Sequence, residues 1–167
     1  MIEEFWPWFR NRSRRKVGYR LLLNRWLVCD AIIAAILTYG LLIDGFGFAA
    51  KALFPAASIL VGMAFAWTSR ASTILNSEDF RSRLITEKNP LEDYIYGFQL
   101  SILILITCVI YLAIMSAGGF NFYIYSREAS RTMSSFFMYS LICLTIRECW
   151  SIINFTSLLT LLDDNAK

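Results

Sequence analysis

Residues 94–115 read YIYGFQLSILILITCVIYLAIM, and this stretch contains no charged residue. At about 1.5 Å of rise per residue, a helix of this length extends roughly 33 Å, which is enough to cross the ~30 Å hydrocarbon core of a bilayer. A soluble domain has no need of so long an uncharged run. The stretch therefore predicts a membrane-spanning helix.

Three further apolar stretches cover residues 26–43, 48–68 and 136–162. The chain is 57% hydrophobic and 17% charged, whereas soluble domains average about 45–50% and about 25%. We therefore expect an all-α integral membrane four-helix bundle over residues 26–162, with a polar loop at 69–93 and a tail at 163–167. The last stretch exceeds the ~20 residues that a bilayer requires, so that helix should tilt or extend beyond the membrane.

Residues 1–25 combine aromatic and basic side chains, which predicts a segment lying on the membrane surface. Tryptophan is favoured at the headgroup level, and Lys and Arg are attracted to anionic lipid. The residues expected to contact the lipid surface are Trp6, Trp8, Arg12, Arg14, Arg15 and Lys16. The alternative is a basic tail that only sets the orientation of the chain.

The distribution of Lys and Arg predicts which ends of the spans face the cytoplasm. Seven precede the first span, four lie in the 69–93 loop and one is at the C-terminus, whereas only Lys51, Arg127 and Arg131 belong to the opposite side. Cytoplasmic flanks carry the excess of basic residues. Twelve against three predicts a multi-pass membrane protein with both termini and the 69–93 loop in the cytoplasm.

Ionisable residues inside the spans are the first candidates for function, because a charge in hydrocarbon is costly and should face protein or water. They are Asp30, Lys51, Arg147 and Glu148. An Arg147–Asp30 contact requires Arg147 to reach toward the cytoplasm, and the alternative is that Asp30 extends to the inner headgroups. Arg147 and Glu148 are adjacent and point about 100° apart, so a shared partner is not expected.

Other polar positions suggest contacts between subunits. Asn154 belongs to a polar stripe on the last span that lines either a wet pathway, a subunit contact or an ordinary helix seam. Ser58, Gly62 and Ala66 place small side chains on one face of the second span, which favours close packing in a homo-oligomer. In the 69–93 loop, mixed charges suit a protein partner rather than lipid. The expected docking residues are Glu78, Asp79, Arg81 and Arg83.

Several chemistries are disfavoured by what the sequence lacks. Histidine is absent, no Gly-rich phosphate-binding loop is present, and none of the four cysteines belongs to a CxxC pair. We therefore expect no enzymatic activity, no cofactor and no metal site. The net charge of +3 is too small to indicate direct nucleic-acid binding.

The layout resembles small four-span membrane proteins of bacterial immunity systems, and in particular the membrane subunits of two-component Kiwa antiphage systems. The resemblance lies in the size, topology and loop placement of the whole chain, including Phe5–Lys16 and the loop motifs SEDF at 77–80 and KNPL at 88–91. It implies an oligomeric inner-membrane sensor that holds a cytosolic, DNA-directed effector. Colicin-type immunity proteins, which bind a toxin within the bilayer, are a second resemblance, and a small channel or holin is a third class.

Overall fold

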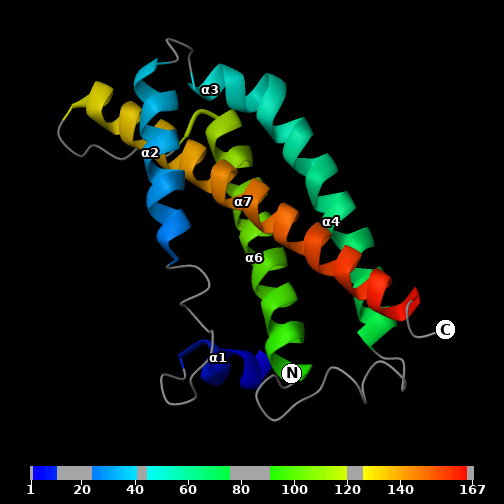
Figure 1. Ribbon diagram of the computed structural model, residues 1–167. Coiled ribbons are helices and arrows are strands. Elements are labelled where there is room, and N and C mark those ends of the chain that lie inside the picture. The colour runs from blue at the N-terminus through cyan, green and yellow to red at the C-terminus, as the bar shows by residue number, and fades with distance from the viewer. Residues whose placement is uncertain (1, 11–23, 41–44, 76–90, 120–125, 165–167) are drawn as a thin grey trace.

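The computed structural model describes residues 2–10, 24–40, 45–75, 91–119 and 126–164. All regular secondary structure in these residues is helical, which confirms the predicted all-α class (Figure 1). The elements are α1 (Ile2–Arg10), α2 (Arg25–Gly40), α3 (Gly45–Phe48), the π-helical turn η2 (Ala49–Leu53), α4 (Phe54–Leu75), α6 (Leu91–Ser116) and α7 (Arg127–Asp164).

Three helical stretches are long and apolar enough to cross a membrane: Gly45–Thr73, Ile95–Ser116 and Arg127–Ser157. They correspond to the expected second, third and fourth spans. The expected first span falls on α2, which has 16 described residues and a length of roughly 24 Å. That is shorter than the hydrocarbon core, and residues 41–43 of the expected span lie outside the described part of the chain.

The ends of these helices differ from the predicted ones. The second begins at Gly45 rather than 48, and the fourth begins at Arg127 rather than 136. Ser126 explains the earlier start of α7, because its Oγ accepts a hydrogen bond from the backbone N–H of Ala129 at 3.1 Å and so caps the first turn. Hydrophobicity alone did not predict the glycine-containing start of the second helix or the polar first turns of α7.

Pro55 accounts for the π-helical turn between α3 and α4. Proline has no N–H to give to the carbonyl four residues earlier, here that of Lys51, and its ring collides with that carbonyl in a regular helix. The chain instead widens by one residue, and the Phe54 N–H bonds to the carbonyl of Ala49. The helix therefore continues through Pro55, and Lys51 lies exposed in the widened turn.

α7 is the central element of the bundle. It runs obliquely across α6 and α4 and packs against α2 on its other side (Figure 1). α7 is also the principal neighbour of α2. At 38 residues α7 is roughly 57 Å long, which agrees with the expectation that the last helix exceeds the membrane thickness.

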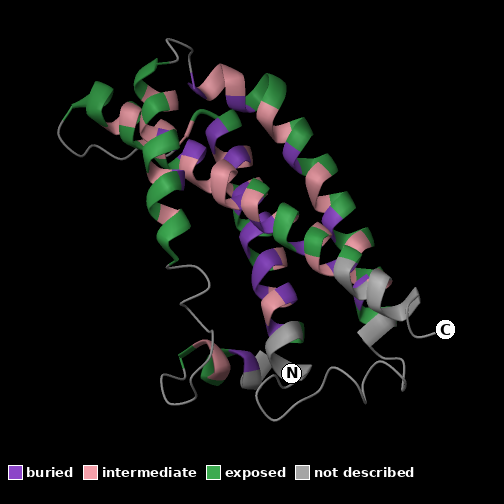
Figure 2. Ribbon diagram, in the orientation of Figure 1, coloured by how far each residue is buried: buried purple, intermediate pink, exposed green. Residues whose placement is uncertain are grey.

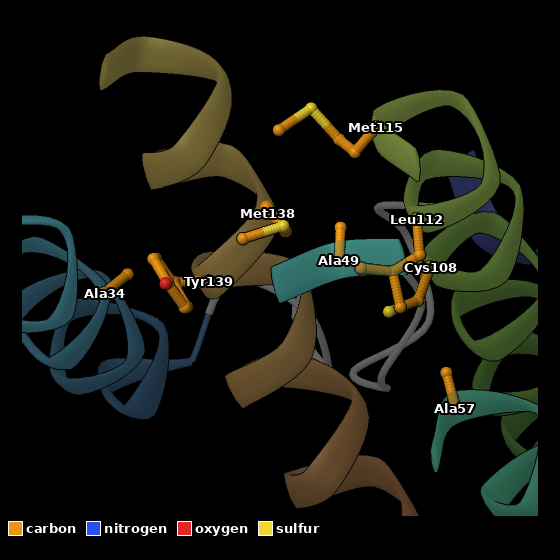
Figure 3. Close-up of a cluster of buried hydrophobic side chains, with 8 residues drawn as sticks. All are labelled: Ala34, Ala49, Ala57, Cys108, Leu112, Met115, Met138 and Tyr139. Atoms are coloured by element: carbon orange, nitrogen blue, oxygen red, sulfur yellow. The ribbon is translucent and has the colours of Figure 1, made fainter. Parts of the chain in front are cut away.

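Buried side chains lie where the helices cross, and the outward faces of α2 and α4 are largely exposed (Figure 2). The largest cluster joins α2, η2, α4, α6 and α7 (Figure 3). Its members are Ala34, Ala49, Ala57, Cys108, Leu112, Met115, Met138 and Tyr139. A membrane helix with such exposed apolar faces presents them to lipid or to another subunit.

Candidate intramembrane ion cluster

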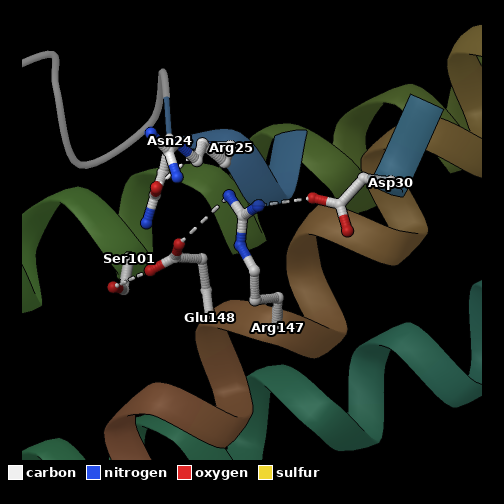
Figure 4. Close-up of polar contacts among 6 residues, drawn as sticks. All are labelled: Asn24, Arg25, Asp30, Ser101, Arg147 and Glu148. Atoms are coloured by element: carbon white, nitrogen blue, oxygen red, sulfur yellow. Dashed lines mark hydrogen bonds and ion pairs between the residues drawn. The ribbon is translucent and has the colours of Figure 1, made fainter. Parts of the chain in front are cut away.

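α7 carries two consecutive ionisable residues that face different neighbours. Glu148 is buried and contacts Ser101 of α6, whereas Arg147 points toward Asp30 of α2 (Figure 4). Adjacent residues of a helix are separated by about 100°, which directs the two side chains to different helices. We call Asp30, Ser101, Arg147 and Glu148 the ion cluster.

The strongest contact of the ion cluster is the pair between α2 and α7. Arg147 donates a hydrogen bond from Nη1 to Oδ2 of Asp30, at 2.6 Å. The side chains are only 22% and 11% exposed, so little solvent can screen the pair. The contact that the sequence left open is therefore present, and Asp30 is buried against α7 instead of extending to the headgroups.

Glu148 connects the same arginine to α6. Ser101 donates a hydrogen bond to Glu148 Oε2 at 2.7 Å, and Glu148 Oε1 lies 3.8 Å from Arg147 Nη2. The guanidinium thus lies between two carboxylates. Besides each other, Arg147 and Glu148 contact different residues, Asp30 and Ser101. The result is a continuous polar chain across α6, α7 and α2.

The cluster is unbalanced in charge and incomplete in hydrogen bonding. Two carboxylates face one guanidinium, which leaves one formal negative charge in excess. Among the described residues, Arg147 Nη2 is buried without a hydrogen-bond partner, as is the hydroxyl oxygen of Ser140 two turns earlier on α7. Buried polar groups are normally satisfied, so each such atom requires an explanation such as a functional role.

The position of Ser101 places the ion cluster near the N-terminal end of α6. Ser101 lies six residues after Ile95, where the apolar stretch of α6 begins, which corresponds to about 9 Å. The rings of Phe98 and Phe155 stack edge to face one turn closer to that end, with centroids 5.3 Å apart. Trp26 and Trp150 are 62% and 63% exposed on α2 and α7, as is typical of side chains at the headgroup level.

The other predicted positions lie apart from the ion cluster. Asn154 is exposed on α7, and Ser58, Gly62 and Ala66 form an exposed face of α4. A side chain added at Gly62 would meet no atom within 4 Å. The small residues that α4 does bury are Ala57, Ala64 and Ala71, spaced by seven.

At the N-terminus, Trp6 is 55% exposed, whereas Trp8 is half-buried with its ring 5.3 Å from that of Tyr96. Two predicted groups lie outside the described residues. These are the basic group Arg12, Arg14, Arg15 and Lys16 and the docking group Glu78, Asp79, Arg81 and Arg83.

Ser101 is the member of the ion cluster that the sequence analysis missed. The available signal was a serine among the leucines and isoleucines of the most apolar span, which also contains Thr107. A hydroxyl can bond to its own helix or to a neighbouring one, so this signal does not identify a partner. In the part of the chain that the structure describes, no three potential metal ligands come together.

The fold and the ion cluster define a helical protein with three helices able to cross a membrane and a charged contact between its helices. No protein-family model, curated protein or solved structure matches this chain.

Proposed function

We propose that this protein is a four-span sensor and scaffold of the bacterial inner membrane, which assembles with itself and recruits or regulates a cytosolic effector in antiphage defence. The observation that carries the proposal is the ion cluster, because it ties α2 to α7 by a charged contact between apolar helices. Charged side chains at such positions are costly and commonly mark a functional element.

The position of α2 explains how the cluster could transmit a signal. α2 has one principal neighbour, α7, and most of its large apolar side chains are exposed. It is therefore the described long helix with the fewest packing contacts to hold it. A disturbance at the envelope that separates Asp30 from Arg147 would leave α2 free to shift, and the segment before α2 would carry the change to the cytoplasmic face.

Self-association follows from the surface that the bundle leaves uncovered. The Ser58, Gly62 and Ala66 face of α4 is exposed in the single chain, and small side chains at four-residue spacing allow a second helix to approach closely. This face would serve contact with a second copy, while Ala57, Ala64 and Ala71 serve contact within one copy.

Mapping the topology tests whether α2 crosses the membrane. Reporters fused to chains truncated after Gly45 and Gly119 should be external, and those after Ser82 and Lys167 should be cytoplasmic. An N-terminal epitope tag should resist protease added from outside, because α2 then forms the first of four spans. An external N-terminal tag would reduce the protein to three spans, and an external signal at Ser82 would reverse the orientation.

The recruitment role is tested by reversing the mixed charges of the 69–93 loop. Glu78→Arg, Asp79→Arg, Arg81→Glu and Arg83→Glu, made together, should release the co-purifying soluble effector in a pull-down. Membrane insertion and oligomer size should not change, because the substitutions lie outside the apolar stretches. Neutralising Arg12, Arg14, Arg15 and Lys16 is the control and should leave the partner bound. Release by the control alone would move the docking surface to the N-terminal segment.

A further inference from the structure

α1 is a short helix whose aromatic side chains gather around Phe5. Apolar residues at Ile2, Phe5, Trp6 and Phe9 follow the spacing of one helical face. The ring of Phe5 lies 5.8 Å from that of Trp8 and 6.1 Å from that of Phe9. Phe5 itself is only 8% exposed. A helix of nine residues does not bury such a residue alone, so the burial must come from the bundle.

The surface that buries α1 belongs to α6 and α7. Phe5 forms one apolar cluster with Tyr96, Leu100 and Ile104, and Leu144 packs against the same cluster. The Phe5 and Tyr96 rings meet at 66° with centroids 6.0 Å apart, and Trp8 lies over the same tyrosine. We call Tyr96, Leu100, Ile104 and Leu144 the α1 platform.

The aromatic residues of α1 have two competing partners. Phe5 and Trp8 are the side chains that an interfacial helix would insert among lipid headgroups, yet here they contact the α1 platform. Trp6 stays 55% exposed, so α1 retains an exposed aromatic residue while docked. Immediately after α1 the sequence supplies Arg12, Arg14, Arg15 and Lys16, which are attracted to an anionic surface.

The α1 platform is adjacent to the ion cluster. Leu100 directly precedes Ser101, and Leu144 lies one helical turn before Glu148. Ser101 donates the hydrogen bond to Glu148, so the α1 platform and the ion cluster occupy neighbouring positions on α6 and α7.

We propose that α1 exchanges between the α1 platform and the surface of an anionic membrane, and that anionic lipid draws it off the platform. The ligand class is negatively charged phospholipid, recognised by an aromatic helix followed by a basic run. This inference requires no effector and no antiphage role, so it stands or falls separately from the proposed function.

A protein with Trp8 as its only tryptophan tests this exchange. Trp6, Trp26, Trp67 and Trp150 are replaced by Phe, and the full chain is placed in phosphatidylcholine vesicles or in vesicles with about one-third phosphatidylglycerol. Both contain the same fraction of brominated phosphatidylcholine, which quenches tryptophan within the bilayer. We expect Trp8 to be quenched roughly twofold more strongly in the anionic vesicles, because undocked α1 inserts its aromatic face.

Removing the platform should have the same effect without anionic lipid. Tyr96→Ala should raise Trp8 quenching in neutral vesicles to the anionic level, whereas Ile95→Ala, at an exposed neighbouring position on α6, should leave it unchanged. Equal quenching in the two vesicles, or no increase with Tyr96→Ala, overturns the proposal. The vesicle comparison leaves the α1 platform unchanged, so it tests whether anionic lipid draws α1 off the platform even when the Tyr96 variant fails to fold.

Discussion

Arg147→Leu is expected to lower the free energy of unfolding of the bundle by about 3 kcal/mol. Removing one partner of a buried ion pair leaves the other charge uncompensated, which typically costs about 3–5 kcal/mol. The lower value applies because the arginine side chain is 22% exposed and water can partly solvate the carboxylates that remain. Membrane insertion should not suffer, since the substitution makes the span more apolar. In cells, the proposed signalling function should be lost.

The measurement is reversible unfolding in lipid–detergent bicelles, arranged as a double-mutant cycle. The double variant Asp30→Asn/Arg147→Leu should be more stable than Arg147→Leu alone, because it removes one of the two uncompensated charges. Lys51→Leu provides the matched control. It removes an exposed cation from another apolar helix and should change stability by less than about 0.5 kcal/mol.

Two outcomes would contradict this interpretation of the ion cluster. If Arg147→Leu unfolds with the wild-type midpoint, the guanidinium does not compensate the carboxylates in the membrane. If the double variant is no more stable than Arg147→Leu, Asp30 does not depend on Arg147 for its charge balance. Stability that falls while cellular function persists would make the cluster structural rather than functional.

The ion cluster was only partly predictable from the sequence. Hydrophobicity and charge identify Asp30, Arg147 and Glu148, because isolated charges are conspicuous in apolar runs. They do not say which helices become neighbours, and the cluster depends on α7 lying between α2 and α6. The sequence does not mark Ser101 as part of a site, because its partner Glu148 is on another helix. Arg147 contacts both carboxylates because its long side chain reaches them, and residue spacing alone does not predict that contact.

The second apolar helix shows a similar limit. The sequence offers two sets of small residues on α4, one at Ser58, Gly62 and Ala66 and another at Ala57, Ala64 and Ala71. Both spacings allow close packing, and the sequence analysis selected the first. The structure buries the second against the rest of the bundle, because α6 and α7 lie on that side. The spacing of small residues predicts that a helix has faces suited to close packing. Which of these faces is buried within one chain depends on where the neighbouring helices lie.

Gly119→Ala is expected to destabilise the protein by about 2–4 kcal/mol, through two effects at the end of the bundle opposite α1. Gly119 has a φ of +79°, a conformation that is strained for residues with a side chain. An added Cβ would also overlap the ring of Phe46, which packs in the main core cluster. The same ring lies 5.6 Å below the guanidinium of Arg131, so moving it disturbs a cation–π contact as well.

Gly118 separates strain from overlap. Its φ is +108°, but a Cβ there would meet no atom within 4 Å. Gly118→Ala should therefore cost about 1–2 kcal/mol from backbone strain alone. In a Phe46→Ala background the ring is gone, so Gly119→Ala should then cost no more than Gly118→Ala does. Thermal unfolding in one detergent measures this cycle, with the wild type compared with Gly118→Ala, Gly119→Ala, Phe46→Ala and the double variant Phe46→Ala/Gly119→Ala. If Gly118→Ala and Gly119→Ala lower stability equally in the wild-type background, the Phe46 ring moves aside at no measurable cost. The turn after α6 is then not fixed by its contact with α3.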